Sequence, residues 1–182
     1  MKNRVGMAVL AALAAHFVFG AITAADYPDA NLVTVEEVER VSYATNGTWR
    51  SERERWTKIL TERGRRNLRS LSFDYNARYG KAELVYVGAI GVDGREREID
   101  FSATLKDTTD NSSADSNIYD PLDRCVSCSV PGLAVGETLH VKMARTAFKS
   151  RVEGAWSDVA VFERTRPVRK SVYEVRAPKD LP

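Results

Sequence analysis

The chain has 182 residues, of which 43% are hydrophobic and 29% are charged, and its formal net charge at pH 7 is +2. This length and composition are typical of a globular protein with a substantial hydrophobic core and exclude a disordered or fibrous chain. The 27 basic side chains are nearly balanced by 25 acidic ones. Because nucleic-acid binding needs a strong basic excess, the charge balance argues against a DNA- or RNA-binding protein.

The N-terminal segment has the features of a secretory signal peptide. Lys2 and Arg4 precede an apolar run over residues 5–19, and small residues follow it, as in exported proteins. We expect cleavage after Ala24 or Ala25, so that residues 1–25 are the signal. An uncleaved anchor is the alternative, since the apolar run approaches the roughly 18 to 20 residues that span a bilayer. The mature protein is therefore expected to be soluble, periplasmic or extracellular, and to meet the membrane only through the signal before cleavage.

Residues 26–182 alternate apolar and polar side chains with a period of two, which favours β-strands in a single domain. The run Leu84–Val92 is nearly all apolar and is interpreted as a strand buried on both faces. Asn46-Gly47 and Asp93-Gly94 each predict a tight hairpin turn. Further strands are expected at residues 41–43, 48–60, 71–75, 95–101, 124–130, 138–146, 159–163 and 168–175, with one helical turn at 61–67. The pattern predicts an all-β fold, an antiparallel β-sandwich or partly open barrel built from hairpins.

A basic stretch over residues 50–69 contains eight basic side chains and three glutamates. One hypothesis is a patch that binds an anionic glycan, a lipid headgroup or an acidic protein. It would comprise Arg53, Arg55, Trp56, Lys58, Arg65, Arg66 and Arg69. Alternating Arg and Glu more often indicate a solvent-exposed strand face with cross-strand ion pairs, which is the favoured interpretation. Trp49 and Trp56 lie seven residues apart, so a regular strand would point them to opposite faces.

Cys125 and Cys128 are the only cysteines and form a C-x-x-C motif. The pair suggests thiol redox chemistry, or half of a zinc site in which His140 is a third ligand. A further alternative is a nucleophilic thiol whose base is His140, since the two predicted strands are neighbours. In a regular strand, however, residues three apart face opposite sides about 10 Å apart, too far for a disulfide. We therefore expect structural or incidental cysteines that Ser can replace, a surface histidine, and no catalytic residue, cofactor or metal.

Residues 107–123 carry five aspartates and no Lys or Arg, which indicates a long acidic loop. The aspartates are Asp107, Asp110, Asp115, Asp120 and Asp123. A calcium loop would also need a bidentate Glu at a fixed spacing. Since that Glu is missing, a solvated loop is the favoured interpretation.

Several turn motifs occur in a recognisable order. They are Lys58-Ile59-Leu60-Thr61-Glu62-Arg63-Gly64, Pro131-Gly132-Leu133 closed by Gly136, and Trp156-Ser157-Asp158. Together they resemble the domain of unknown function 3857 family, from about residue 32 to residue 182. In many bacterial envelope proteins this β-rich module precedes a transglutaminase-like thiol domain. The resemblance implies no catalytic residues, and the C-x-x-C motif is not part of it.

The sequence thus predicts an exported, non-catalytic binding or scaffolding module of the bacterial envelope, whose companion transglutaminase-like domain is absent from this chain. Its expected partner is a protein or a glycan of the envelope, with no nucleic acid. Two alternatives stay open. One is a redox or metal-binding protein that uses Cys125 and Cys128; the other is an enzyme subunit whose catalytic domain is encoded separately.

Overall fold

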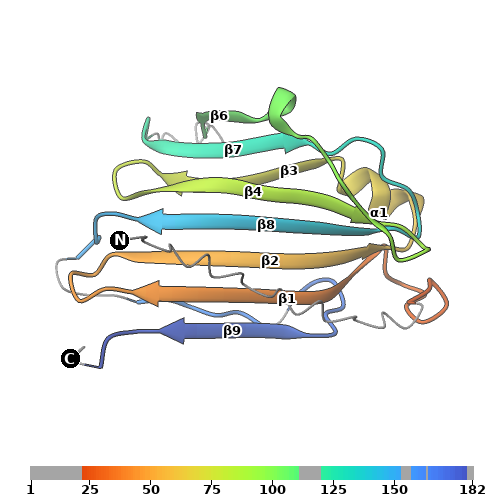
Figure 1. Ribbon diagram of the computed structural model, residues 1–182, viewed down its shortest axis with the longest axis horizontal. Coiled ribbons are helices and arrows are strands. Elements are labelled where there is room, and N and C mark those ends of the chain that lie inside the picture. The colour runs from red at the N-terminus through yellow and green to blue at the C-terminus, as the bar shows by residue number, and fades with distance from the viewer. Residues whose placement is uncertain (1–21, 111–119, 153–156, 163, 180–182) are drawn as a thin grey trace, which may run out of the picture.

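The computed structural model describes residues 22–110, 120–152, 157–162 and 164–179, which form two stacked β-sheets (Figure 1). The larger sheet contains, in spatial order, β5 (Glu96–Glu98), β4 (Gly80–Ile90), β8 (Thr138–Ala147), β2 (Trp49–Ile59), β1 (Leu32–Tyr43) and β9 (Ser171–Arg176). The smaller sheet contains β3 (Ser70–Asn76), β7 (Asp123–Ser129) and β6 (Lys106–Thr109), and the short helices are α1 (Glu62–Asn67) and η1 (Ser102–Thr104). Neither sheet closes into a barrel, so the predicted all-β sandwich is confirmed.

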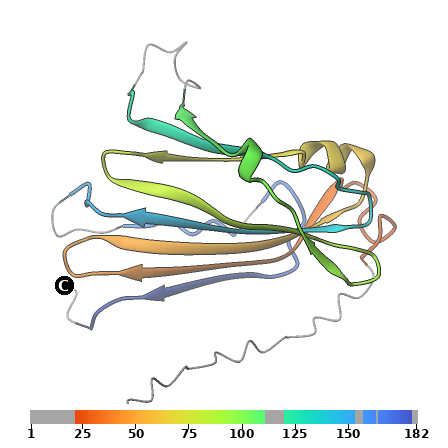
Figure 2. The same cartoon turned by 45° about the horizontal axis from the view of Figure 1, so that its top comes forward.

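The smaller sheet covers only part of the larger one. Figure 2 shows β3 and β7 over the β4 side, while β1 and β9 extend away from them. We call the face of the larger sheet that is turned toward the smaller sheet the inner face, and the opposite one the outer face. The main core lies between the two sheets and includes Leu71, Phe73, Leu84, Val87, Val126, Cys128, Leu139 and Val141. The inner face of β2 and β1 therefore lies largely outside this apolar core.

Both predicted hairpins are confirmed. β1 and β2 pair in antiparallel fashion across Asn46-Gly47, where Gly47 has a φ of 79° and the Ala44 N–H donates to the Thr48 carbonyl at 2.9 Å. β4 and β5 pair across Asp93-Gly94, where Gly94 has a φ of 78°. Because positive φ is cheap only for glycine, the local sequence fixes both turns.

The interpretation of residues 84–92 as buried on both faces is wrong. Val85 is 57% exposed and Val92 is 83% exposed. The pairing of β4 with β8 shifts register between Leu84 and Tyr86, so Val85 is an extra residue in the strand. This bulge allows Leu84 and Val87 to face the same core although an odd number of steps separates them.

The C-terminal part of the chain also departs from the expected hairpins. Val159 is 80% exposed, and residues 159–162 form no strand; residue 163 lies outside the described residues. The expected strand at 168–175 starts at Ser171 and runs parallel to β1, after an isolated bridge between Val168 and Thr34. A parallel neighbour cannot be reached through a tight turn, so no hairpin signal precedes it.

The expected acidic loop begins instead with a strand. Lys106–Thr109 form β6, which pairs with β7, and the Asp107 carboxylate accepts from Tyr75 Oη at 2.7 Å. Asp115 lies outside the described residues. Asp120 and Asp123 accept hydrogen bonds from the Asn76 amide, so these two carboxylates stabilise the end of β3.

A second apolar cluster lies on the outer face of β1. It contains Ile22, Val33, Val35 and Leu60, with Trp56 packed against it. The predicted cleavage after Ala24 or Ala25 would remove Ile22 from this cluster. Within the described residues, no helix has the length and apolar character needed to cross a bilayer.

Helix α1 confirms the helical turn expected at 61–67, and Gly64 is its most constrained residue. The Gly64 N–H donates to Thr61 Oγ1 at 3.1 Å, which caps the helix. A Cβ at Gly64 would lie 2.1 Å from the Asn31 carbonyl oxygen. The helix therefore packs on the start of β1 at a distance that only glycine permits.

Replacing Gly64 with Ala should lower the free energy of unfolding by about 1–3 kcal/mol, because the overpacking outweighs the gain in helix propensity of about 1 kcal/mol. Urea unfolding would measure it. The control is Arg63→Ala in the same helix, whose exposed side chain should leave stability within about 0.5 kcal/mol. A Gly64→Ala protein as stable as the wild type would contradict the close packing.

Candidate functional site

The seven residues of the predicted basic patch do not share one surface. β2 pairs with β8 without a register shift, and Arg53 and Arg55 lie opposite Met143 and Val141, which pack in the core. Arg53 and Arg55 therefore belong to the inner face. Trp56 lies opposite His140, so it and Lys58 belong to the outer face.

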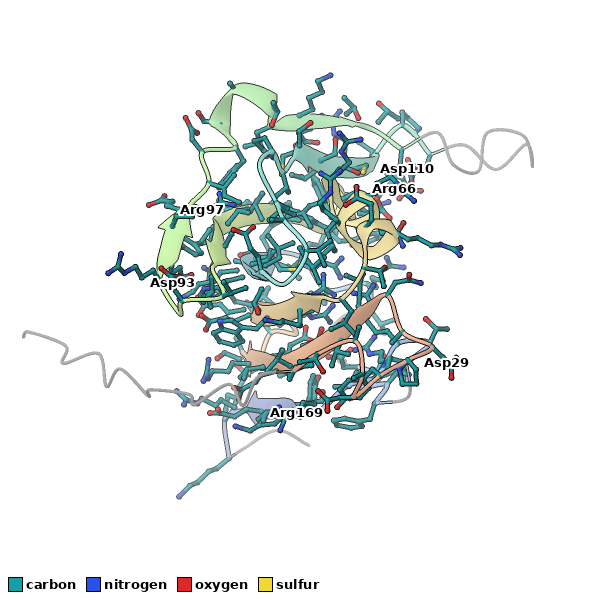
Figure 3. All side chains as sticks on the ribbon, turned by 90° about the vertical axis from the view of Figure 1, so that its right-hand side faces the viewer. Asp29, Arg66, Asp93, Arg97, Asp110 and Arg169 are labelled. Carbon is teal, nitrogen blue, oxygen red and sulfur yellow. The ribbon has the colours of Figure 1, made fainter. Side chains whose placement is uncertain are left out.

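Most of these basic side chains already have partners. Arg53 Nε lies 3.0 Å from Glu39, Arg55 lies 3.7 Å from Glu37, and Lys58 Nζ donates to the Gly136 carbonyl at 2.5 Å. Arg65 and Arg66 both pair with Glu62 on α1, and Figure 3 shows Arg66 at the α1 end of the molecule. Arg69 follows the same helix. The basic side chains of this stretch are therefore distributed over both faces of the larger sheet and the α1 end of the molecule.

The two cysteines are separated as regular strand geometry requires. β7 keeps an unbroken register with β3, Cys128 lies in the core with 4% exposure, and Cys125 is half-buried. Burial raises the pKa of both thiols; the hydrogen bond and charge of Asp74 raise that of Cys125 further. Raised values disfavour the thiolate that redox chemistry and metal binding need.

His140 is not beside the cysteines, and it is not on the surface. Its strand β8 lies between β4 and β2, whereas β7 belongs to the smaller sheet. The His140 side chain points to the outer face and is 8% exposed. No group of three or more potential metal ligands occurs among the described residues. The structure therefore does not bring Cys125, Cys128 and His140 together.

His140 instead sits at the centre of a polar cluster on the outer face. Nδ1 lies 2.6 Å from Glu96 on β5, and Nε2 lies 2.7 Å from Glu54 on β2. The ring stacks on Trp56 at a centroid distance of 4.5 Å and meets the edge of Tyr86 at 5.1 Å. The cluster thus ties the edge strand β5 to the middle of the sheet through one histidine whose two ring nitrogens each contact a carboxylate.

Glu54 is the electrostatic anchor of this cluster. Burial alone would raise its pKa, but hydrogen bonds from His140 and Lys142 outweigh burial and lower the pKa to about 2. Lys142 Nζ lies 2.8 Å from Glu54 and 5.9 Å from the centroid of the Tyr86 ring. All of these partners are engaged with one another, which is the arrangement of a structural cluster and leaves none of them poised for a ligand.

A different feature has the geometry of a binding site. A cleft of about 380 Å³ opens between the two sheets, at the end where β2 and β4 begin and β3 and β8 end. Its volume lies within the range of small-molecule pockets, roughly 300–1,000 Å³. The aromatic side chains of its described lining are Trp49 from β2, Tyr75 from β3 and Tyr79 from the β3–β4 turn. It lies at the left-hand end of Figure 1, opposite α1.

The cleft also has an excess of positive charge. Its described lining contains four cationic side chains, Lys81, Arg145, Lys149 and Arg151, and one carboxylate, Asp74. The Arg151 guanidinium lies 5.2 Å from the centroid of the Tyr79 ring, and Lys81 pairs with Glu83 at 2.9 Å. These contacts hold the cations at the rim beside the aromatic rings.

Arg145 is the distinctive member of the lining. Its Nε is buried and has no hydrogen-bond partner in the described part of the chain. Burial lowers the pKa of Arg145, and the charge of Arg53 lowers it further, whereas the charges of Glu39 and Asp74 raise it. A buried guanidinium nitrogen without an acceptor is costly, and a bound anion would satisfy it. No local sequence pattern predicts this cleft, because its residues come from distant segments.

Replacing Glu54 with Gln tests the outer-face cluster. Since the pKa of Glu54 lies below its ordinary value of 4.5, its ionised form contributes stability above about pH 4.5, and this contribution is lost as the pH falls toward 2. The variant should unfold about 1–3 kcal/mol more easily than the wild type at pH 7, because His140 and Lys142 lose their partner. Urea unfolding at pH 7, 4 and 3 would show whether this difference shrinks in acid.

The matched control for that experiment is Glu52→Gln, on the same face of the same strand. Glu52 is 63% exposed and pairs with Arg50, so its loss should change stability by less than about 0.5 kcal/mol at any of these pH values. A Glu54→Gln difference that does not change with pH would contradict the ionised cluster.

The two cysteines should respond differently to Ser. Cys128→Ser should lower the free energy of unfolding by about 1–3 kcal/mol, because a hydroxyl replaces a thiol in the apolar core. Cys125→Ser should cost less than about 1 kcal/mol at its half-buried position. For Cys128 this prediction replaces the expectation that Ser can be substituted freely, because the structure places that thiol in the core. Iodoacetamide should label Cys128 only after denaturant is added, and rapid labelling of the folded protein would argue against its burial.

Comparison with solved structures identifies the fold. The chain is similar to a protein from Parabacteroides distasonis ATCC 8503, provisionally described as a protease, with a TM-score of 0.70 and 12% identity over 84% of this chain and 30% of that one. This chain thus spans less than a third of that protein. An M1 zinc metallopeptidase from Deinococcus radiodurans (TM-score 0.33, 10% identity, 65% and 20% covered) and the CBM3a-L domain of the Clostridium thermocellum scaffoldin CipA (0.36, 12%, 74% and 79%) are too distant to inform this chain.

Comparison with curated proteins gave no match. The model of one family, described as a domain of unknown function with a solved structure, matches residues 45–182. These residues include every strand of both sheets except β1. The chain therefore belongs to the domain of unknown function 3857 family.

Proposed function

We propose that this chain is an exported, non-catalytic binding module of the bacterial envelope, and that an anionic glycan binds in its cleft. The observation that supports this proposal is the buried Nε of Arg145, which has no hydrogen-bond partner among the described residues, in a cleft lined by aromatic rings. The described residues of the cleft include no cysteine or histidine, which favours binding over catalysis. A catalytic companion of the transglutaminase-like kind, on another chain or elsewhere in a longer one, is part of the same proposal.

The cleft can distinguish an acidic sugar from a neutral one. A carboxylate near Arg145 would form charge-assisted hydrogen bonds with a planar donor group. The apolar face of a sugar ring would lie against Trp49, whose indole is half-buried at the cleft wall. A volume of about 380 Å³ accepts one or two sugar rings of a longer chain. Of the bacterial wall sugars, N-acetylmuramic acid has the required carboxylate, whereas N-acetylglucosamine lacks it.

The test compares two disaccharides that differ in that carboxylate. N-acetylglucosaminyl-N-acetylmuramic acid should bind at least ten-fold more tightly than di-N-acetylchitobiose, as measured by isothermal titration calorimetry at low ionic strength. Arg145→Gln should reduce the affinity for the acidic sugar to that for the neutral one. A loss of affinity of ten-fold or more corresponds to a loss of at least roughly 1.4 kcal/mol of binding free energy. Trp49→Leu should weaken both sugars.

Arg40→Gln is the matched control, since it removes an arginine from β1 whose partner is Glu174 at 3.4 Å and which does not line the cleft. It should bind both sugars as the wild type does. Equal affinity of the wild type for the two sugars, or an Arg145→Gln protein that keeps the preference, would refute the proposed role of the cleft.

A further inference from the structure

A second pocket lies away from the cleft, where the C-terminal segment meets β1. Residues 167–169 pair with Thr34: its N–H donates to the Pro167 carbonyl at 2.9 Å, and its carbonyl accepts from the Arg169 N–H at 2.9 Å. Together with β1, β2 and the first residue of β9, the segment encloses a pocket of about 220 Å³. None of its lining residues lines the cleft.

Three arginines and one glutamate of the described chain line this pocket. Glu37 is buried and accepts from Arg164 at 2.9 Å, and its other carboxylate oxygen lies 3.7 Å from Arg55. One carboxylate thus faces three guanidinium groups, because Arg166 also lines the pocket. The neighbouring Arg53 does not change this balance, since it is paired with Glu39. Among the residues that the structure describes, the lining carries two positive charges more than Glu37 can neutralise.

Arg166 is the arginine left over. Its Nη1 is buried and has no hydrogen-bond partner among the residues that the structure describes. The same crowding acts on Arg55: burial lowers its pKa, Glu37 raises it, and the charges of Arg166, Arg53 and Arg164 lower it. Uncompensated charge in a partly buried site destabilises the fold unless an ion of opposite sign binds there.

The excess charge and the donors suit a tetrahedral dianion. Guanidinium groups bind phosphate in bidentate fashion, and Arg is the residue of choice for such sites. A phosphate group carries about −1.5 to −2 charges at pH 7, which balances the excess of two. The hydroxyl-bearing residues Thr34, Thr165 and Ser171 also line the pocket.

We propose that the pocket formed by Arg55, Arg164 and Arg166 around Glu37 binds a phosphate or sulfate group, either free or at the end of a larger molecule. The bound group would join β1, β2 and the segment before β9. It would thereby hold the parallel strand β9 in place.

Thermal unfolding in inorganic phosphate at constant ionic strength tests this site. Phosphate at about 10 mM, enough to fill most of a site with a millimolar Kd, should raise the Tm of the wild type, because the folded state alone binds it. Arg166→Gln should abolish this rise in Tm, because the variant should bind phosphate at least ten-fold more weakly. Without phosphate this variant should be at least as stable as the wild type, since it loses an unmatched charge.

Arg169→Gln is the control. It removes the same charge from the same segment, but Arg169 does not line the pocket and its side chain is exposed (Figure 3). It should keep the full response to phosphate. No rise in the wild type, or an equal rise in Arg166→Gln, would overturn the proposal.

Phosphorus-31 NMR of phosphate mixed with wild-type protein gives an independent readout if Arg166→Gln does not fold. Saturable broadening that sulfate reverses and chloride does not would support the site, and unchanged linewidths would overturn it.

Vesicles containing phosphatidic acid then separate the two sources of the phosphate group. Retention of the wild type but not of Arg166→Gln identifies a lipid phosphate, and no retention identifies a free or soluble phosphate. Sugar binding in the cleft should be unchanged in Arg166→Gln, so failure of one site leaves the other standing.

Discussion

The unbroken antiparallel pairing of β2 with β8 decides which way each charged side chain in the middle of the larger sheet points. Because strand side chains alternate, this register sends Arg53 and Arg55 to the inner face and Glu54 and Trp56 to the outer face. A shift of this pairing by one residue would turn the Glu54 side chain to the inner face and the Arg55 side chain to the outer face. The polar cluster, the cleft and the arginine pocket all depend on this single register.

The unequal width of the two sheets explains why so much charge lies inside the sandwich. Three strands cover β4 and β8 with apolar side chains, but β2, β1 and β9 have no facing sheet. Their inner face is occupied instead by ion pairs such as Arg53 with Glu39 and Arg55 with Glu37. The buried nitrogens that lack partners within the described residues, on Arg145 and Arg166, both occur on this side of the molecule.

Local signals in the sequence predicted local structure well. Asn46-Gly47 and Asp93-Gly94 specified their hairpins because each short turn is closed by hydrogen bonds within its own few residues. The parallel pairing of β9, the bulge at Val85 and the burial of His140 could not be predicted, since each depends on residues far along the chain. The polar ring nitrogens of His140 find their partners in Glu54 and Glu96, which come from two other strands.

The candidate sites show why a dense run of charge is a poor guide to function in a β-rich chain. Alternation divides such a run between two faces, and on each face opposite charges from the neighbouring strand neutralise it. The charges that stay unmatched come from separate segments, as Arg145 does on β8 and Arg166 does before β9. Such positions cannot be recognised before the pairing of the strands is known. In a sheet protein the informative residue is therefore the buried cation whose own face supplies no partner, because only an external anion can satisfy it.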